Sequence, residues 1–234
     1  MKSNVSYNII GDIHGRTCWK SLVREDCVNI FVGDYFDPYE FILKEQLLSN
    51  FYDIIAFKKQ HPETVLLYGN HDFHYLLRGE ERYSRYNILS APAYWRVFRE
   101  TESLFYGIAF PIENKALVSH AGVTKEWYAK YIGTYHSEPP ADVAKRINDL
   151  WKIDKQAFAF DTNVNDLEDC YGTSPTHSPI WIRPWMLRDH NLFAGTDIMQ
   201  IFGHTQTEGG IMKDRNLIYV DCLGTKEKSY VMEA

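Results

Sequence analysis

The stretch VNIFVGDYFD, residues 28–37, decides how this chain folds. It starts as a run of apolar and β-branched residues, which is typical of a buried strand, and ends in a glycine and two carboxylates. Gly33 allows a sharp turn at the end of that strand, so Asp34 is expected at the carboxyl edge of a sheet, where open α/β folds bind ligands. Residues 7–15, YNIIGDIHG, and residues 64–72, TVLLYGNHD, repeat this order of strand, glycine and polar side chains.

Two later stretches each place a histidine at the end of a predicted strand. In ALVSHAG, residues 116–122, this residue is His120, and in IMQIFGHT, residues 198–205, it is His204. The sequence therefore contains five predicted strands that each end in metal-ligand chemistry, and we expect their ends to meet in one site.

Helical patterns alternate with the first three predicted strands. Residues 17–26 predict a helix, and residues 40–60 predict a longer one in which Leu47, Phe51 and Ile54 form an apolar stripe. This alternation predicts a parallel sheet with right-handed crossovers. Further along, the patterns predict helices at residues 72–77, 91–104, 125–131 and 140–152, a hairpin from residues 105–111 and 115–119, and short strands at residues 201–202, 210–212, 217–220 and 229–232.

The composition is that of one globular domain. The chain has 234 residues, of which 45% are hydrophobic and 24% are charged, and this length is sufficient for one well-buried core. We expect a single domain over residues 1–234 with an inserted cap at residues 133–184. Within that cap, residues 161–179 are polar, acidic and rich in Thr, Ser and Pro, which predicts a long loop or lid.

Charge and cysteine content exclude several classes of function. The formal net charge is −6 and no basic block is present, which argues against binding to duplex nucleic acid. No apolar run approaches the roughly 18 residues of a membrane span, and the first residues leave no room for a signal peptide. The four cysteines form no CxxC pair. We therefore expect a cytoplasmic protein that does not interact with a membrane.

The side chains at the strand ends form a mixed set of nitrogen and oxygen donors. Such a set suits Mn, Fe, Zn, Co or Ni better than an all-oxygen calcium site. Six donors are too many for one catalytic ion, but they suit two ions about 3.5–4 Å apart that share a carboxylate. Two such ions polarise a phosphoryl oxygen and generate a hydroxide from a water between them. The candidate donors are Asp12, His14, Asp34, Asn70, His120 and His204.

The motifs GDIHG, GDYFD, GNHD, SHAG and GHT, in this order, resemble those of the calcineurin-like metallophosphoesterases. The similarity extends over residues 11–205 and is strongest to the branch that contains phosphoprotein phosphatases and symmetrical diadenosine tetraphosphatases. It implies a four-layer αββα sandwich, an α/β (α+β) fold. It also implies hydrolysis of a phosphoester by two divalent metal ions, most often Mn, through a metal-bridging hydroxide.

The resemblance also assigns the metal ligands. Asp12 and His14 would hold the first ion, and Asp34 would bridge both ions. The second ion would be completed by three further side chains, namely Asn70, His120 and His204.

Three further residues are expected to act in catalysis. By resemblance, His71 would assist the leaving group as a general acid or as an imidazolium. Asp37 would pair with His71, orient its ring and raise its pKa. Arg183, in the stretch SPIWIRP, would bind phosphoryl oxygens with its guanidinium group.

The chain departs from the phosphoprotein phosphatases at two positions. Where these enzymes have a phosphate-binding arginine after the second motif, this chain has Pro38 followed by Tyr39, and Arg16 or an arginine of residues 78–85 is a candidate substitute. The third motif ends in Asp72, where eukaryotic phosphoprotein phosphatases typically have glutamate.

These departures leave the substrate open. A phosphatase acting on phosphomonoesters, including phosphoproteins of the Ser/Thr type, is the leading prediction. A dinucleoside polyphosphate hydrolase is the alternative, and a catalytically inactive metal-binding interaction module is the alternative from another class. The expected partners are a phosphorylated small molecule, a nucleotide or a phosphoprotein substrate.

Overall fold

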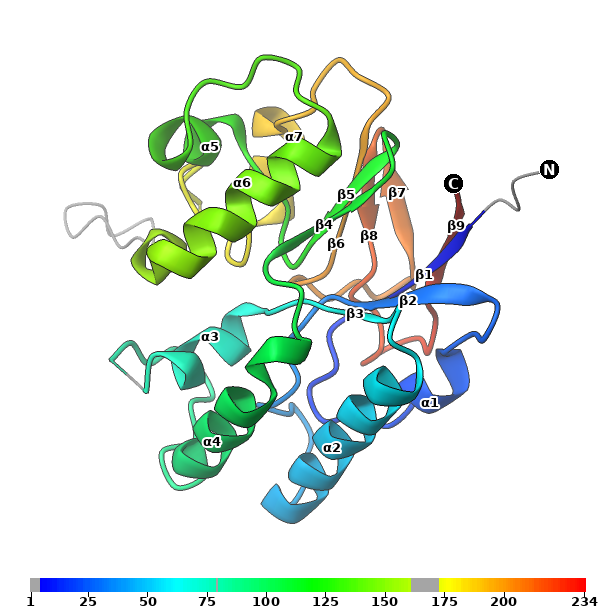
Figure 1. The fold of residues 1–234 in the computed structure, drawn as a ribbon, viewed down its shortest axis with the longest axis vertical. Helices are drawn as coiled ribbons and strands as arrows, with labels where there is room; N and C mark the ends of the chain where they lie inside the picture. The colour runs from blue at the N-terminus through cyan, green and yellow to red at the C-terminus, as the bar shows by residue number, and fades with distance from the viewer. Residues whose placement is uncertain (1–4, 79, 161–172) are drawn as a thin grey trace.

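The computed structural model describes residues 5–78, 80–160 and 173–234. These residues form two β-sheets that pack against each other, with helices on the outside (Figure 1). The helices are α1 (Trp19–Leu22), α2 (Lys44–Gln60), α3 (Asn70–Leu76), α4 (Ala91–Thr101), α5 (Lys125–Tyr131), α6 (Pro140–Ile153) and α7 (Pro184–His190). Short 3-10 helices follow α4, at Glu102–Leu104, and α6, at Lys155–Phe158.

The first sheet contains the strands that begin the chain. Its order is β3-β2-β1-β9, formed by β1 (Ser6–Ile10), β2 (Cys27–Phe31), β3 (Val65–Leu66) and β9 (Tyr230–Glu233). Strands β1, β2 and β3 are parallel, as the alternation of strands and helices predicts, and β9 runs antiparallel to β1.

The second sheet has the order β4-β5-β6-β8-β7. It is formed by β4 (Ala109–Ile112), β5 (Ala116–Ser119), β6 (Met199–Phe202), β7 (Met212–Asp214) and β8 (Leu217–Tyr219). The pairs β5-β6 and β6-β8 are parallel, whereas β4-β5 is the predicted antiparallel hairpin. Five parallel strands, three in the first sheet and two in the second, thus precede the motifs singled out in the sequence.

Alternation of side chains along the strands explains why the two sheets stack. Ile9 and Ile30 of the first sheet share one buried cluster with Ile201 and Ile218 of the second. Their chain neighbours, such as Phe31, point to the opposite face, because successive side chains of a strand alternate between faces. The result is the four-layer arrangement of helix, sheet, sheet and helix that the resemblance implies.

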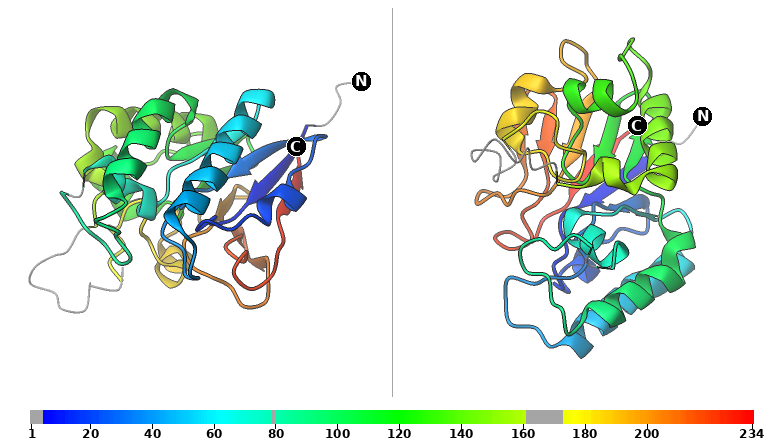
Figure 2. Two further views of the ribbon diagram at one scale, coloured as in Figure 1. Left: turned by 90° about the horizontal axis from the view of Figure 1, so that it is seen from below. Right: turned by 90° about the vertical axis from the view of Figure 1, so that its left-hand side faces the viewer.

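The outer layers consist of helices from different parts of the chain. Helices α1, α2 and α4 cover the first sheet, and α5, α6 and α7 lie on the side of the second (Figure 1). Helices α2 and α4 lie side by side (Figure 2), and the rings of Phe51 and Phe98 pack across them with centroids 5.3 Å apart. The predicted apolar stripe of α2, with Leu47, Phe51 and Ile54, is buried.

Two predicted helices are shorter than expected. Residues 17–26 form only the single turn α1, because Asn8 Nδ2 donates to the carbonyl of Leu22 and Asn29 Nδ2 donates to that of Arg24. Side chains of the sheet therefore bind the backbone oxygens that a longer helix would use. Residues 40–43 also lie outside α2, which begins at Lys44 after the backbone N–H of Leu43 donates to the side chain of Gln46.

The expected cap lies only partly within the described residues. Its helix α6 packs on β4 and β5 and contributes Val143, Ile147 and Trp151 to the main core, so this helix is part of the outer layer. Residues 161–172, most of the predicted lid, lie outside the described part of the chain. A cap that closes over the site stays a prediction. Among the described residues, none of the helices combines the length and apolar character that crossing a membrane requires.

Candidate metal centre and active site

The loops after β1 and β2 continue side by side beyond the sheet. The backbone N–H groups of Ile13 and His14 donate to the carbonyls of Gly33 and Asp34, with N···O distances of 3.3 and 2.6 Å. Parallel pairing thus extends into the two motifs. His14 and Asp34 are therefore neighbours as a direct consequence of the register of β1 and β2.

The loops after β2 and β3 are joined by the carboxylate of Asp72. One of its oxygens accepts the N–H groups of Asp34 and Gly69, each at 2.8 Å, and the other accepts the N–H of Tyr35 at 2.9 Å. The backbones also approach closely, since a side chain on Gly33 would overlap Gly69. Asp72 therefore acts by holding the loop that carries Asp34, a role that follows from the position of the residue in the fold and not from its motif.

Asp34 lies at the centre of the candidate metal site. Its Oδ2 is 3.5 Å from Nε2 of His14 and 3.5 Å from Nε2 of His120, while Oδ1 accepts the backbone N–H of His71 at 2.8 Å. Separations of this size are those of donor atoms that share an ion with bonds of about 2 Å. The two histidines lie on either side of the same oxygen, which is the position a bridging carboxylate requires.

A second group of candidate metal ligands faces Asp34. His120 follows β5, Asn70 begins α3, and His204 lies in the loop after β6. Oδ1 of Asn70 lies 2.9 Å from both Nε2 of His120 and Nδ1 of His204. The remaining ring nitrogens donate outward, Nδ1 of His120 to the carbonyl of Val32 and Nε2 of His204 to the carbonyl of Trp181. The nitrogens that face Asn70 therefore carry lone pairs.

These three atoms, Oδ1 of Asn70, Nε2 of His120 and Nδ1 of His204, are all hydrogen-bond acceptors, and none of them carries a positive charge. Burial lowers the pKa of His204 well below its usual value and also lowers that of His120, so both rings are neutral near pH 7. Two ring nitrogens and the oxygen of Asn70 then face one another without a hydrogen between them. A cation among them would remove this repulsion, so these residues fit a metal ion.

The ring of His14 is also neutral, and it is likewise oriented by backbone carbonyls so that one nitrogen faces Asp34. Its Nδ1 lies 3.1 Å from the carbonyl of Phe36 and 3.0 Å from that of Asp37, which directs Nε2 towards Asp34. Burial lowers the pKa of His14 to about 4, so the imidazole is a neutral ligand over the whole physiological range.

Three buried carboxylates meet at this site. They belong to Asp12, Asp34 and Asp221, and Asp12 and Asp34 together with His120 offer ligand atoms within 4.8 Å of one another. Burial and the charges of Asp221 and Asp34 raise the pKa of Asp12 well above its usual range. Burial and Asp34 raise the pKa of Asp221 to about 7. Divalent cations are the natural counterions for such a cluster.

Asp221 is a site residue that the sequence analysis missed. It lies two residues after strand β8 and forms a hydrogen bond with Asp12. In YVDCLG the carboxylate follows the apolar residues without a glycine before it, so this stretch lacks the order of strand, glycine and polar residue that marks the other motifs. The backbone N–H of His204 also donates to both oxygens of Asp12, at 3.2 and 3.0 Å, and so positions this carboxylate.

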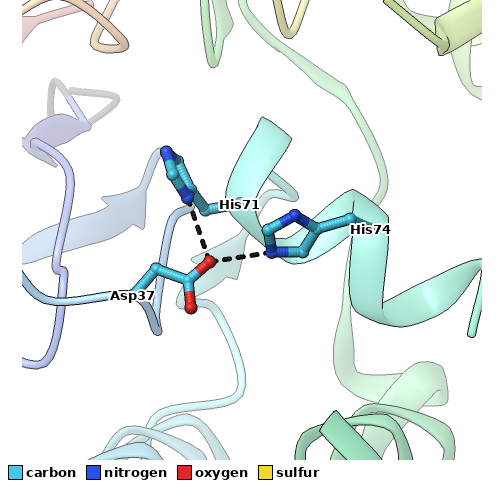
Figure 3. A group of neighbouring side chains, drawn as sticks. All are labelled: Asp37, His71 and His74. Carbon is cyan, nitrogen blue, oxygen red and sulfur yellow. Dashed lines mark hydrogen bonds and ion pairs between the residues drawn. The ribbon is translucent and has the colours of Figure 1, made fainter. Parts of the chain in front are cut away.

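His71 and Asp37 form the expected pair beside the metal ligands (Figure 3). Nδ1 of His71 lies 3.0 Å from Oδ2 of Asp37, and the ring packs edge-on against that of His14, with centroids 5.2 Å apart. Burial acts to lower the pKa of His71, but the charges of Asp34 and Asp37 outweigh it and the net shift is upward. The ring therefore holds a proton more tightly than a free imidazole does, which suits a group that protonates a leaving group.

Asp37 has two further partners from α3. Nε2 of His74 lies 2.7 Å from the same oxygen, Oδ2 (Figure 3). The hydroxyl of Tyr75 donates to Oδ1. Burial alone would raise the pKa of Asp37, but the hydrogen bonds from His71 and His74 lower it. Asp37 is thus a fully bonded carboxylate that fixes one ring nitrogen of His71.

Arg183 lies at the start of α7, next to the His204 loop. Its Nη1 is 3.4 Å from the carbonyl oxygen of His204 and 3.2 Å from Oγ1 of Thr205. Burial lowers the pKa of the guanidinium group, and the charges of Asp12 and Asp34 act to raise it. The guanidinium group therefore borders the metal-site carboxylates. The nine predicted site residues thus lie together.

Several residues of the site adopt a strained backbone. His14, Asp34, Asp37 and His204 all have positive φ angles, between 44° and 66°. This left-handed conformation costs roughly 1–3 kcal/mol for a residue with a side chain, and it persists where the surrounding structure enforces it. The folded structure thus holds these side chains in place at the expense of local stability.

Comparison with known proteins agrees with this geometry. Residues 7–208 match the family model of calcineurin-like phosphoesterases. The match covers most of the chain, which therefore belongs to the calcineurin-like phosphoesterase family and is a metal-dependent phosphoester hydrolase. No curated protein matches the sequence.

A solved structure supports the fold assignment. The chain resembles a protein serine/threonine phosphatase from Saccharomyces cerevisiae, described as similar to human phosphatase PP5, with a TM-score of 0.53. The similarity covers 99% of this chain and 80% of the yeast chain at 16% sequence identity. At this level of identity the comparison establishes a shared fold.

Proposed function

We propose that this protein hydrolyses phosphomonoesters with two divalent metal ions, Mn²⁺ foremost. The observation that carries the proposal is the position of His71. This residue is a buried imidazole with a raised pKa, whose backbone N–H donates to the carboxylate of Asp34 and whose ring is held by Asp37. A general acid fixed next to a metal-binding carboxylate is what hydrolysis of a phosphoester requires.

The metal ions would be held by the donors described above. Asp12 and His14 would bind the first, Asn70, His120 and His204 would bind the second, and Asp34 would contact both. When bound, the ions supply Lewis-acid activation of the phosphoryl group and of the attacking water.

The chain's own residues would do the remaining work. Arg183 would hold equatorial phosphoryl oxygens with its planar guanidinium group and so orient the substrate. His71 would donate a proton from its Nε2 to the oxygen of the leaving group as the P–O bond breaks. Asp37, which accepts from Nδ1, would keep the ring in the orientation and protonation state that this transfer needs.

Cationic groups around the site favour a monoester. A phosphomonoester carries more negative charge on the transferred group than a diester does, and the guanidinium group of Arg183 and the imidazole of His71, whose pKa is raised, would balance it. Phosphorylated small molecules and phosphoproteins are both substrates of this class. A dinucleoside polyphosphate is the competing substrate, because the metal ions and Arg183 would hold its scissile phosphoryl group in the same way.

A panel of substrates tests this proposal. Phosphate or nucleotide release is measured for an aryl phosphomonoester, an alkyl phosphomonoester, an aryl phosphodiester, a phosphoserine peptide and diadenosine tetraphosphate, with Mn²⁺ and with a chelator. The proposal expects chelator-sensitive hydrolysis that is fastest for monoesters. Faster cleavage of diadenosine tetraphosphate would transfer the assignment to the competing substrate.

The role of His71 has its own test within the panel. His71→Asn should lower kcat on the alkyl phosphate by about 10²–10⁴-fold and on the aryl phosphate by much less, since a good leaving group needs no proton. His61→Asn, at a half-exposed histidine paired with Glu63, is the matched control. Equal losses on both substrates would contradict the acid role.

A further inference from the structure

Tyr39 stands beside the metal centre and is flanked by two arginines. Its ring packs edge-on against the imidazole of His14, with centroids 4.9 Å apart, and it is 52% exposed. The Cζ of Arg85 lies 4.0 Å from the centre of the Tyr39 ring, and the Cζ of Arg16 lies 5.9 Å from it. Positive charge is thus arranged around an accessible aromatic surface at the edge of the site.

The two arginines differ in their counterions. Arg16 donates through Nε and Nη2 to the carboxylate of Glu40, at 3.2 and 3.1 Å, so its charge is compensated. Arg85 donates from Nη1 to the carbonyl of Pro38 at 3.2 Å, which is a neutral partner. Throughout residues 5–78, 80–160 and 173–234, no carboxylate lies within ion-pair distance of Arg85. The Arg85 side chain is also exposed, so an anion can reach its guanidinium group.

The fold holds Arg85 in this position. Arg85 has a left-handed backbone, with φ at +65°, which an arginine adopts only under constraint. The next residue, Tyr86, stacks on Tyr75 with ring centroids 5.2 Å apart, and the backbone N–H of Asn87 donates to the Tyr75 hydroxyl. Tyr75 in turn donates to Asp37, so the Arg85 loop is tied to the catalytic network.

Arg85 lies on the His71 side of the site, whereas Arg183 lies beside the His204 loop. The chain after Arg85 contacts Tyr75, which donates to Asp37, the partner of His71, and His71 is the residue proposed to protonate the leaving group. A group that Arg85 binds is therefore attached to the leaving-group side of the substrate, beyond the phosphoryl group that is transferred.

We propose that Arg85, stacked on Tyr39, binds a second anionic group of the substrate and so selects phosphoesters that carry a carboxylate or another phosphate on the leaving group. This inference rests on the proposed function and names its substrate class. A guanidinium can stack on an aromatic ring and at the same time present a planar fork to an anion. Tyr39 is a positioning residue in this arrangement, since its ring holds the guanidinium group of Arg85.

The test compares substrates that differ only in their far end. Alkyl phosphates with three to six carbons are prepared with a methyl, a carboxylate or a second phosphate at the end of the chain, so that the leaving alkoxide is similar throughout. The wild-type protein with Mn²⁺ should show about tenfold higher kcat/KM for an anionic end than for a methyl end, mainly through KM. The carboxylate and phosphate arms identify which anion is preferred.

Variants assign this preference to Arg85. In Arg85→Gln the ratio of kcat/KM between anionic and methyl ends should fall to near one, and Arg85→Lys should retain part of it. Arg78→Gln is the matched control, because Arg78 also has a positive φ, of 55°, and stacks on an aromatic ring, with its Cζ 4.1 Å from the ring of Trp95. A wild type without preference, or an Arg85→Gln variant that keeps it, would overturn the proposal.

A binding measurement separates this proposal from the proposed function. Calorimetric titration of the Mn²⁺-loaded protein with alkane bisphosphonates and alkylphosphonates of the same lengths requires no turnover. About tenfold tighter binding of the bisphosphonate, lost in Arg85→Gln, would support the second-anion site even if none of the esters were hydrolysed. Equal binding of both ligands would overturn it even in an active enzyme.

Discussion

The imidazole of His74 lies 2.7 Å, Nε2 to Oδ2, from the carboxylate of Asp37. This contact is shorter than the 3.0 Å from Nδ1 of His71 to the same oxygen, so His74 binds Asp37 at least as closely as His71, the proposed general acid, does. Asp37 thus has its position set by α3 from within the core.

Removing His74 should therefore affect both stability and turnover. His74→Ala leaves a cavity and takes a hydrogen bond from a buried carboxylate, which should lower the free energy of unfolding by about 2–4 kcal/mol. We expect kcat to fall about tenfold, because Asp37 no longer fixes His71, while metal content stays the same. Denaturant unfolding, kinetics and metal analysis check this, and an unchanged kcat in the folded variant would contradict it.

A pair of glycines offers a test of the Asp12 position. A Cβ on Gly203 would overlap Oδ1 of Asp12 and come within 3.0 Å of Val32, whereas a Cβ on Gly209, six residues later, meets nothing within 4 Å. Gly203→Ala should displace the Asp12 carboxylate and weaken Mn²⁺ binding by at least tenfold, and Gly209→Ala should behave as wild type. Competition with a fluorescent chelator measures both affinities. Identical affinities would show that Asp12 does not bind the metal.

Metal binding should depend on pH through the buried carboxylates. Burial and Asp34 raise the pKa of Asp221 to about 7, and the pKa of Asp12 is also raised, by burial and by Asp221 and Asp34. In the metal-free folded protein Asp221 therefore keeps a proton below about pH 7, and Asp12 holds its proton to a higher pH than an ordinary aspartate, so Mn²⁺ must displace protons to bind. The apparent affinity for Mn²⁺ should rise as the pH rises through this range.

Asp221→Asn tests the cause of that dependence. Without the negative charge of Asp221, Asp12 loses its proton at a lower pH, so the midpoint of the affinity curve should move to lower pH. Asp214→Asn, at a surface residue paired with Arg188 at 2.9 Å, should leave the midpoint in place. A midpoint that moves upward, or a flat curve in the wild type, would contradict the explanation.

The sequence could predict that the candidate metal ligands lie together, because each of them follows a strand. Glycine and a polar residue after an apolar run is a local pattern, and parallel strands bring their ends to one edge whatever the intervening chain does. This logic brought together residues as distant as Asp12 and His204, which are hydrogen-bonded in the fold. Asp221 follows β8 without a glycine before it, so only the position of the strand end, and not the full motif, indicates this residue.

Other features depend on contacts that have no local pattern. The helix expected at residues 17–26 is cut to one turn by the side chains of Asn8 and Asn29, which look like ordinary strand residues in the sequence. The roles of Asp72 and His74 arise from hydrogen bonds to residues 37 or 38 positions earlier in the chain. The stacking of Arg85 on Tyr39 likewise requires the tertiary fold.

The central claim is that Asp34 joins two metal ions into one hydrolytic centre, and a stoichiometric titration tests it most directly. Metal-free protein is titrated with Mn²⁺ while bound metal and hydrolysis of an aryl phosphate are followed together, for the wild type and for Asp34→Asn. Asp53→Asn, at a surface residue paired with Lys20 at 2.6 Å, serves as the control. We predict that wild-type and control activity reach a plateau at two ions per chain, and that Asp34→Asn loses the paired binding and at least 10³-fold in kcat. Full activity with one ion per chain, or normal turnover in Asp34→Asn, would contradict the claim.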